Sequence, residues 1–402
     1  MTYEHSRAYR GWRIVAVCFV IATFAWGFGF YGQGVYLAEL LKLRGWSLSL
    51  VSGAVTMFYF VSAIMVAFVA DWIAAIGAPR VVAGGLAIMG ASVFALGIVD
   101  APWQLYLVFL FMSFGWASTS VGAITNVVGM WFSARRGLAI SLALTGASAG
   151  GVLVVPALQA LIVATGFTRA MALSGATLTL VGAPLALLLI ETPAPTGRTA
   201  GGASIAGVAK AALLRSFAFW SFAGPFSVFW ITQTAFLVHQ INIFTPALGP
   251  KGAGAAVAVT TFSAVAGRVL MGFAIDRIDR RLVTGALVAG QAFAMAALVL
   301  WPTPAVLFLG AAVYGLAVGN VITLPSLIVQ QEFEAAAFGL VVALATSANQ
   351  MAGAFGPGLL GLGRDLSGSY AIPLGCCALL NLCSAAAVVL LRPRAGARES
   401  GA

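Results

Sequence analysis

The sequence predicts an all-α membrane protein whose twelve transmembrane helices form two six-helix bundles. Three observations lead to this prediction. Charged residues make up only 8% of the 402-residue chain, whereas 61% of the residues are hydrophobic. The apolar residues are gathered in runs that are long enough to cross a bilayer. One segment in the middle of the chain, 191–215, interrupts this pattern with prolines, glycines and basic residues.

The low charge content excludes a soluble protein. A soluble domain carries about 25% charged residues, so this chain cannot cover its surface with polar groups and must expose apolar surface to lipid. The formal net charge is +10, but the basic residues lie in short clusters between apolar runs rather than on one polar face. This distribution indicates membrane topology and excludes a nucleic-acid interface.

The apolar runs divide the chain into its spans. Each run is expected to be helical, because an open strand cannot satisfy its backbone hydrogen bonds in lipid. The predicted spans are 13–38, 47–70, 81–99, 103–130, 137–164, 168–190, 216–245, 253–275, 282–301, 304–329, 337–362 and 370–391. Segment 191–215 is predicted to be a cytoplasmic linker. It separates an N-terminal bundle, 1–190, from a C-terminal bundle, 216–402.

The lysines and arginines predict the orientation in the membrane. Fifteen of the 21 basic residues lie in the termini and the even-numbered loops, and five lie in the odd-numbered loops. The positive-inside rule therefore places both termini in the cytoplasm, in a multi-pass protein of the cell inner (plasma) membrane. A cleavable signal peptide is not expected, because the first apolar run is too long and further spans follow it.

The two halves show signs of an internal repeat. Asp71 follows span 2 in "VADW", and Asp276 follows span 8 in "FAIDR", about half a chain length later. Gly137 opens span 5 in the same way that Gly339 opens span 11. Repeated halves are how many transporters build a central binding site.

The residues for catalysis or cofactor binding are not found in the sequence. No nucleophile–base pair, metal-ligand set or nucleotide loop is present, so neither an enzyme nor a bound metal or cofactor is predicted. The four cysteines lie inside apolar runs and are expected to be small buried hydrophobic residues. Gly27, Gly29 and Gly32 have the spacing of a dinucleotide fingerprint, but no strand precedes them. We expect these glycines to let the first span bend and pack.

Three sequence motifs carry a family resemblance. "WFSARRGLAISLALTGASAGG" (131–151) places an aromatic pair and two basic residues before a run of small and apolar residues. It resembles the span-5 signature of the monocarboxylate transporter branch of the major facilitator superfamily. "YRGWRIVAV" (9–17) is similar to a reduced span-1 signature of that branch. "GRVLMGFAIDR" (267–277) is similar to the span-8 segment of monocarboxylate transporters and oxalate:formate antiporters. The resemblance implies two bundles around a central cavity.

Arg268 is the basic residue that lies inside a span. An arginine at the centre of a membrane helix costs about 2.5–3.5 kcal/mol on insertion scales, so its side chain must face a cavity or a partner. No Asp or Glu lies in a span core, and the natural partner is therefore a substrate carboxylate held in the guanidinium fork. The resemblance implies the same role. The alternative is that Arg268 snorkels or binds backbone carbonyls at a helix end.

Two departures from the resembling families bear on the substrate. Proton-coupled monocarboxylate transporters carry an acid one turn before this arginine, where this chain has Ala264. Oxalate:formate antiporters carry a lysine in span 11, where the "AFGP" alignment places Asn349. One fixed cation instead of two favours a monocarboxylate over oxalate. Asn349 and Gln350 are predicted to hydrogen-bond the substrate, with polar packing between helices as the alternative.

Further polar and aromatic residues lie inside the spans. Tyr31 lies one turn from Phe28 and Gly34 and is predicted to face the cavity and contact the substrate. His239 is the intramembrane histidine, and it could couple protons or form a hydrogen bond between helices. The remaining candidates for the cavity, with core or lipid packing as the alternative, are Trp116, Asn126, Trp230, Tyr314 and Asn320.

Charged residues at the cytoplasmic ends of spans 2/3 and 8/9 are the candidates for gating: Asp71, Arg80, Asp276 and Arg277. Ion pairs between them would hold the cytoplasmic side closed when the protein opens outward, and a simple topology signal is the alternative. Pro325 and Pro357 interrupt spans 10 and 11, where a gate could hinge.

The predicted function is secondary active transport of a small organic anion, above all a monocarboxylate, by alternating access. The transport mode is proton symport or anion exchange, and a monomer in the lipid bilayer suffices. A carrier for a neutral or other small solute is the alternative, since it would not need Arg268. A multidrug exporter would need intramembrane acids. A transporter-fold sensor would need an output domain, which the short tail after span 12 does not offer.

Overall fold

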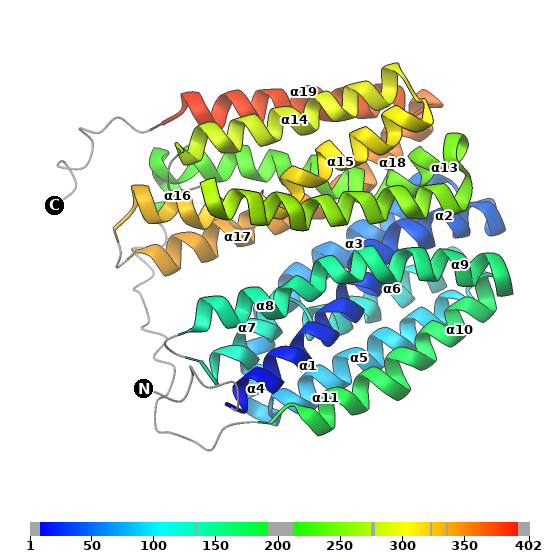
Figure 1. Cartoon of the computed structure of the whole chain (residues 1–402). Helices are drawn as coiled ribbons and strands as arrows, with labels where there is room; N and C mark the ends of the chain where they lie inside the picture. The colour runs from blue at the N-terminus through cyan, green and yellow to red at the C-terminus, as the bar shows by residue number, and fades with distance from the viewer. Residues whose placement is uncertain are drawn as a thin grey trace.

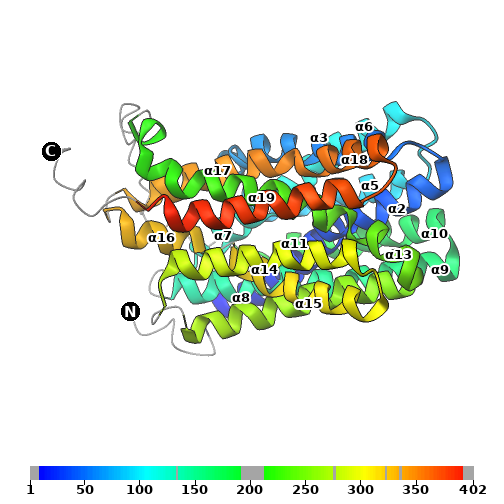
Figure 2. The same cartoon turned by 90° about the horizontal axis from the view of Figure 1, so that it is seen from above.

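The computed structural model describes residues 9–132, 135–191, 212–274, 278–321, 324–334 and 337–392. These residues are almost entirely helical and form two bundles that lie side by side (Figures 1 and 2). The first described helix begins, and the last one ends, at the same end of the molecule, which we call the terminal end. The other end is called the opposite end.

The N-terminal bundle contains six passes, several of which are divided into shorter helices. Its elements are α1 (Gly11–Phe24), η2 (Ala25–Tyr31), α2 (Gly32–Arg44), α3 (Leu48–Val66), α4 (Val69–Ile76), α5 (Ala78–Leu96), α6 (Pro102–Ala117), α7 (Val121–Gly129), α8 (Arg136–Ala149), η3 (Gly150–Val154), α9 (Val155–Thr165), α10 (Phe167–Thr177), η4 (Leu178–Gly182) and α11 (Ala183–Leu189).

The C-terminal bundle repeats this plan with fewer, longer helices. Its elements are α13 (Phe217–Ala274), α14 (Arg280–Leu300), α15 (Pro304–Val321), α16 (Leu324–Glu332), α17 (Phe338–Ala354), α18 (Gly356–Ser367) and α19 (Ala371–Leu390). Most of the predicted linker 191–215 lies outside the described residues, so the domain boundaries stay a prediction.

The helix lengths agree with twelve membrane passes. Within the described residues, nine helical segments are long and apolar enough to span a bilayer, and the bent pair α15–α16 makes a tenth. One of the nine segments, Phe217–Met271, contains two passes, and the pair α17–α18 supplies the last one. The many large apolar side chains on the outer surface, such as Leu188, Leu366 and Leu390, match a lipid-facing exterior.

Four predicted spans differ in detail from the structure. Spans 7 and 8 were predicted as separate runs with a loop between them, and α13 does consist of two helices, but the break between them is the single non-helical residue Gly249, where φ is 67°. Only glycine adopts this left-handed conformation readily, so one residue suffices for the reversal. Spans 10 and 11 are each divided, with Pro325 and Pro357 at the second positions of α16 and α18. Proline is favoured in the first turn of a helix because its missing N–H is not needed there.

The first pass is irregular at its centre. Residues 25–31 form the π-helical segment η2, which changes the usual pairing of backbone groups. Side chains supply hydrogen bonds to its carbonyls: Gln33 Nε2 donates to Gly29 O at 2.9 Å and Tyr36 Oη donates to Phe28 O at 3.1 Å. Gly27 allows η3 to approach closely, because a Cβ at this glycine would lie 2.5 Å from Val154 Cβ. Glycine and buried side-chain donors therefore hold the irregular turn in place.

The two bundles touch mainly toward the opposite end. The backbone N–H of Ser49 donates to Asp365 Oδ2 at 2.7 Å, and the N–H of Gly358 donates to Thr56 Oγ1 at 2.9 Å. Both contacts join α3 of the N-terminal bundle to α18 of the C-terminal bundle. A Cβ at Gly34 would lie 2.7 Å from the Val238 carbonyl oxygen, so α2 and α13 also pack closely. These contacts close the space between the bundles at this end.

Candidate functional site

A cavity of about 290 Å³ lies between the two bundles. Its lining comes from both halves of the chain and includes residues from the middle of the first and seventh passes. It extends to Val66 at the end of α3, to Val121 at the start of α7 and to Pro325 at the start of α16. Each of these residues lies toward the terminal end. The cavity is thus closed at the opposite end and reaches toward the terminal end.

The N-terminal bundle supplies an aromatic wall. We use this term for the cavity-lining residues Trp26, Phe30, Tyr31, Tyr59 and Trp116. Trp26 and Trp116 meet edge-on with ring centroids 4.9 Å apart, and Phe30 stacks on Trp116 at 6.1 Å. Three of the five rings come from η2, so the irregular turn of the first pass presents much of this surface.

The C-terminal bundle supplies a polar wall opposite the rings. It consists of Gln233, Thr234, Thr346, Asn349 and Gln350, with Trp230 beside them. Asn349 Oδ1 accepts a hydrogen bond from Ser227 Oγ at 3.0 Å, which leaves its amide nitrogen without a described partner. The predicted positions Asn349, Gln350 and Tyr31 therefore all line the cavity, and their contact with a substrate stays a prediction.

Arg268 lies at the edge of the cavity rather than among its lining residues. Its Nε donates to the Gly319 carbonyl oxygen at 3.1 Å, and Gly319 follows the cavity-lining Val318. Its guanidinium lies near Tyr31 of the aromatic wall. No carboxylate among the described residues forms an ion pair with it. The side chain thus carries a half-buried charge beside the cavity.

The alternative interpretation of Arg268 is that it binds backbone carbonyls at a helix end. The hydrogen bond to Gly319 fits this interpretation for one nitrogen of the guanidinium, Nε. Gly319 lies in the last turn of α15, where carbonyl groups lack helical donors. Within the described part of the chain, Nε is the nitrogen of Arg268 that has a partner, and both Nη groups have none. The guanidinium is therefore anchored at one edge, and its fork is still available for an anion.

Close helix packing fixes this position of Arg268. A Cβ at Gly319 would lie 2.0 Å from the Ala264 carbonyl oxygen, and a Cβ at Gly267 would lie 2.3 Å from the Leu316 carbonyl oxygen. The second half of α13 therefore packs backbone to backbone against α15. Ala264 is buried in this crossing. A larger acidic side chain at this buried position would have to displace the two packed helices.

His239 lies outside the cavity lining and is buried within the C-terminal bundle. Its Nε2 is 3.0 Å from the Pro357 carbonyl oxygen, and its Nδ1 is 3.1 Å from Tyr370 Oη. A carbonyl only accepts, so we assign the proton to Nε2, and Nδ1 then accepts from the tyrosine hydroxyl. Both nitrogens are satisfied in this neutral form. The proton-coupling role of His239 stays a prediction.

The predicted gating residues of the N-terminal bundle do not pair. Asp71 and Arg80 are both exposed, and Arg80 Nη1 donates to the Ile76 carbonyl oxygen at 3.4 Å. No ion pair joins them in the described residues. Their counterparts Asp276 and Arg277 lie outside the described residues. The latch therefore stays a prediction for a conformation closed at the terminal end.

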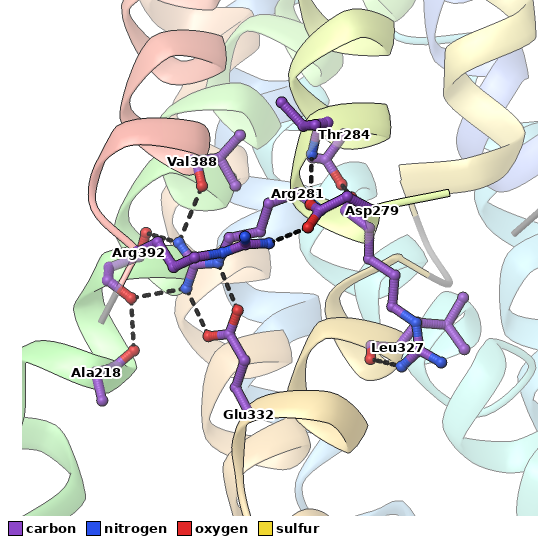
Figure 3. A network of polar contacts seen from close by, with 11 residues as sticks. Ala218, Asp279, Arg281, Thr284, Leu327, Glu332, Val388 and Arg392 are labelled. Atoms are coloured by element: carbon purple, nitrogen blue, oxygen red, sulfur yellow. Dashed lines mark hydrogen bonds and ion pairs between the residues drawn. The ribbon is translucent and has the colours of Figure 1, made fainter. Parts of the chain in front are cut away.

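A buried ion pair clamps the terminal end of the C-terminal bundle (Figure 3). Arg281 is 1% exposed, and its Nε and Nη2 donate to the two Glu332 carboxylate oxygens at 2.6 and 2.7 Å. The same guanidinium donates to the Val388 carbonyl at 2.9 Å and to Ser221 Oγ at 2.9 Å. One side chain of α14 thus connects α13, α16 and α19. All of these helices belong to one bundle, so the cluster makes that bundle rigid rather than joining it to the other.

A second ion pair lies beside this cluster, between Arg392 and Asp279 (Figure 3). The hydrogen bond from Arg392, together with the backbone N–H groups of Arg281 and Leu282, holds the pKa of the Asp279 carboxyl below its usual range. A depressed pKa means that the stabilisation is present above the unfolded-state pKa and is lost as the pH falls through the folded-state pKa. Asp279 also caps α14, because its carboxylate accepts from the Arg281 N–H at 3.0 Å.

Asp365→Asn is expected to weaken the closure of the opposite end. The Asp365 carboxylate accepts a hydrogen bond from the Ser49 N–H, which has no partner within its own helix because it lies in the first turn of α3. The helix dipole favours a negative charge at this position. Loss of this charge should shift the equilibrium toward the outward-opened form about fivefold, which corresponds to about 1 kcal/mol. The measurement is the rate at which a membrane-impermeant thiol reagent labels a cysteine introduced at Ser52, which is fully buried between α3 and α18.

The matched control for this prediction is Asp100→Asn. Asp100 pairs with Arg44 at 2.7 Å, but both residues belong to the N-terminal bundle, so rocking of the bundles does not break this pair. Labelling should rise with the Asp365 variant and not with the control. Equal labelling rates in both variants would remove the closing role of Asp365.

The sequence did not single out several residues of the cavity. Gln233 and Thr234 come from "WITQTAF" in span 7, and three adjacent polar residues inside an apolar span were a readable signal. Trp116 and Trp230, named as candidates, do line the cavity. Tyr314 is instead buried against Phe236, with ring centroids 4.2 Å apart.

The two remaining candidates bind backbone of their own helix. Asn126 donates to the Gly122 carbonyl at 2.8 Å, and Asn320 donates to the Leu316 carbonyl at 2.9 Å. Neither lines the cavity.

The two-bundle architecture with a central cavity can be compared with known families. The family model of the Major Facilitator Superfamily matches residues 19–357. The chain belongs to the Major Facilitator Superfamily. The predicted family and the predicted all-α membrane fold are confirmed. Members of this superfamily are membrane transporters, and this Major Facilitator Superfamily protein is accordingly a multi-pass transporter and not an enzyme.

Two curated relatives cover much of this Major Facilitator Superfamily protein. Monocarboxylate transporter 11 of Homo sapiens is 29% identical over 312 residues, which is 70% of this chain and 63% of the relative. Monocarboxylate transporter 11 of Mus musculus is 29% identical over 339 residues, or 76% of this chain and 72% of the relative. The match thus spans slightly less than two thirds of the length of the human relative.

Solved structures show the same fold at low sequence identity. The nucleoside transporter NupG superposes with a TM-score of 0.79 at 14% identity and covers 95% of this chain and 98% of its own. A bacterial homolog to the human lysosomal transporter Spinster, in an inward-facing and occupied conformation, has a TM-score of 0.73 at 16% identity, with coverage of 96% and 97%. These similarities establish the fold of this Major Facilitator Superfamily protein and leave its substrate open.

Proposed function

We propose that this protein is a secondary active transporter that moves a small monocarboxylate across the membrane by alternating access. The observation that carries the proposal is Arg268, a half-buried cation beside the central cavity with no described carboxylate partner. A charge of this kind is expensive inside a membrane unless an anion or a cavity compensates it. The names of the two curated relatives support the same substrate class.

The geometry suggests how a carboxylate would be held. Arg268 is anchored through Nε to Gly319, which leaves the two Nη groups for the oxygens of one carboxylate. Tyr31 of the first pass lies near the same guanidinium. A bound anion would therefore lie between the two bundles and neutralise the charge of Arg268. Neutralisation lowers the free energy needed to enclose that charge when the bundles rock.

The end toward which the cavity extends indicates which state of the transport cycle this conformation belongs to. The positive-inside rule places the terminal end in the cytoplasm. With that orientation, the cavity reaches toward the cytoplasm and is closed toward the outside by α3 and α18. The protein would therefore be in its inward-facing state. Proton symport and anion exchange both fit this cycle, and the buried Ala264 in place of an acid favours exchange.

A carrier for a neutral solute is the second candidate. It is favoured by the composition of the cavity lining, which combines aromatic and aliphatic side chains with amides and hydroxyls, and by the place of Arg268 at the edge of that lining. A neutral planar solute would need hydrogen bonds from the polar wall but no cation. The two candidates make opposite predictions for a ligand whose carboxylate is replaced by an amide.

Matched pairs of ligands test the proposal. The thermal unfolding midpoint of the purified full-length protein in detergent is measured with lactate against lactamide and with benzoate against benzamide. At least one acid should raise the midpoint, and its amide should not, because only the acid can pair with Arg268. Equal stabilisation by acid and amide would support the neutral-solute carrier instead. Stabilisation by amides alone would also overturn the monocarboxylate proposal.

A further inference from the structure

We infer that the substrate is an aryl monocarboxylate: one carboxylate on an aromatic ring that carries a hydrogen-bonding substituent. Its ring would lie on Trp26, Phe30 and Trp116, and its substituent would reach Gln233. The inference rests on the proposed carboxylate site at Arg268. It goes beyond that site because it derives the body of the substrate from the two walls of the cavity.

The rings of the aromatic wall contact one another and form a continuous surface. Trp26, Phe30 and Trp116 contact one another at centroid distances of 4.9 and 6.1 Å, and Tyr59 meets Phe30 at 5.8 Å. These contacts fix the orientation of each ring. Aromatic rings bind other aromatic rings in offset or edge-on geometry more strongly than they bind aliphatic groups of similar area. The wall therefore favours a ligand that is itself aromatic.

Gln33 and Gly29 hold the aromatic wall in position from the side that faces away from the cavity. Gln33 Nε2 binds the Gly29 carbonyl, which holds the turn that carries Phe30. A Cβ at Gly29 would lie 2.6 Å from Trp116 Cε3, so this glycine allows the Trp116 ring to lie directly against the backbone of η2. The protein's own packing thus fixes the ring surface, which lowers the entropy lost on binding.

Gln233 supplies the requirement for a polar substituent. It is 1% exposed and lines the cavity, and its Oε1 is buried without a hydrogen-bond partner among the residues that the structure describes. Buried polar atoms in native structures are nearly always paired. Exchange of the amide oxygen and nitrogen would leave the nitrogen unpaired in the same place, so either assignment leaves a group that needs a partner. A hydroxyl or amino group on the substrate ring would supply it.

The volume of the cavity agrees with a ligand of this size. Pockets for compact organic ligands have volumes of about 300–1,000 Å³, and this cavity of about 290 Å³ is at the lower limit. An acetate or pyruvate ion bound at Arg268 would leave most of the aromatic wall in contact with water. A single aromatic ring would cover the wall and still reach the polar side.

The first experiment varies the ligand on the purified full-length protein. Isothermal titration compares benzoate with cyclohexanecarboxylate, acetate and benzamide. Benzoate should bind about fivefold more tightly than cyclohexanecarboxylate, because the two differ mainly in aromatic contacts. Acetate should bind more weakly than either ring acid. Para- or meta-hydroxybenzoate should bind about tenfold more tightly than benzoate, because a ring hydroxyl pairs with Gln233.

The second experiment assigns these preferences to residues. Trp116→Leu should remove the preference of benzoate over cyclohexanecarboxylate, and Trp116→Phe should restore most of it. The matched control is Trp103→Leu in the same helix, since Trp103 is 66% exposed on the outer surface. Gln233→Leu should remove the gain from the ring hydroxyl. Its control is Gln240→Leu, which is also buried with an unpaired Oε1 in α13 but does not line the cavity.

The outcomes separate this inference from the proposed function. If the acids bind in preference to benzamide but benzoate, cyclohexanecarboxylate and acetate bind equally, the aryl inference is wrong and the carboxylate site stands. If benzamide binds as tightly as benzoate, the carboxylate site itself is wrong. If none of the ring compounds binds while acetate or pyruvate does, the substrate is a short acid and the aryl inference is overturned.

Discussion

Arg268→Gln is expected to lower the affinity for a monocarboxylate by about a hundredfold. The change removes the positive charge and both Nη groups, and truncation of one partner in a desolvated charge pair costs about 2–5 kcal/mol. The glutamine keeps a hydrogen-bonding group at the end of the side chain, so the effect reports the charge and the fork rather than a cavity. Affinity is measured by isothermal titration with the acid that binds the wild-type protein most tightly.

For the same variant, the thermal stability of the ligand-free protein is expected not to fall. Without ligand, Arg268 carries a half-buried charge with no described carboxylate partner. Its removal should leave the unfolding midpoint equal to or higher than that of the wild type, because the charge is costly inside the bundle. A protein that is as stable as the wild type and no longer responds to the acid is the signature of a binding residue. A structural residue would lower stability instead.

Two further variants control this prediction. Arg268→Lys keeps the charge but loses the planar fork, so binding should fall by about tenfold, between the wild type and the glutamine variant. Arg169→Gln removes an exposed arginine of α10 and should leave affinity unchanged. Undiminished binding by the Arg268→Gln protein would exclude Arg268 as the carboxylate site and favour the neutral-solute carrier.

Glu332→Gln is expected to cause the largest loss of stability, about 3–5 kcal/mol. Arg281 is almost fully buried, and its charge is compensated by the Glu332 carboxylate at 2.6 and 2.7 Å. Removal of one partner from a buried ion pair leaves the other charge buried and uncompensated. The unfolding midpoint of the purified protein should fall accordingly. Ligand affinity should change little, because the pair lies at the terminal end of the bundle and not in the cavity lining.

A double-mutant cycle separates the pair from its neighbours. Arg281→Met alone leaves Glu332 free to turn toward solvent, since its side chain is 16% exposed, and should cost less than Glu332→Gln. The double variant should recover part of the loss, because no unpaired charge then remains buried. Arg392→Gln, which breaks the more exposed pair with Asp279, should cost at most about 1 kcal/mol. Additive effects in the cycle would argue against direct coupling of Arg281 and Glu332.

The membrane-spanning helices could be predicted from the sequence because bilayer thickness imposes a length on every apolar run. The composition of the runs does not reveal where a helix bends inside the membrane. Spans 10 and 11 are divided near Pro325 and Pro357, as the prolines indicated. The π-helical turn η2 was not predicted, because its stability depends on tertiary donors such as Gln33 and Tyr36 that the linear sequence does not bring together.

The sequence identified part of each wall, such as Asn349, Gln350 and Tyr31, and missed Gln233 and Thr234. Asn349 and Gln350 are conspicuous inside an apolar span, because an unpaired amide in lipid is costly. A tryptophan such as Trp116 is compatible with lipid, core or cavity, and only the rotation of its helix decides among them. That rotation follows from packing between helices, for instance from Gly29 against Trp116. For the same reason the sequence placed Arg268 in the cavity, whereas the fold puts it at the edge.

The π-helical turn η2 couples ligand selectivity to the shape of the first pass. Seven consecutive residues, Ala25–Tyr31, both interrupt the regular first pass and supply three of the five rings of the aromatic wall. A mutation in this stretch that alters which ligands are preferred is expected also to alter how the first pass bends during transport. Variants of Trp26 or Phe30 should therefore change turnover together with preference. Tyr59 and Trp116 sit on regular helices, and there the two properties can be tuned separately.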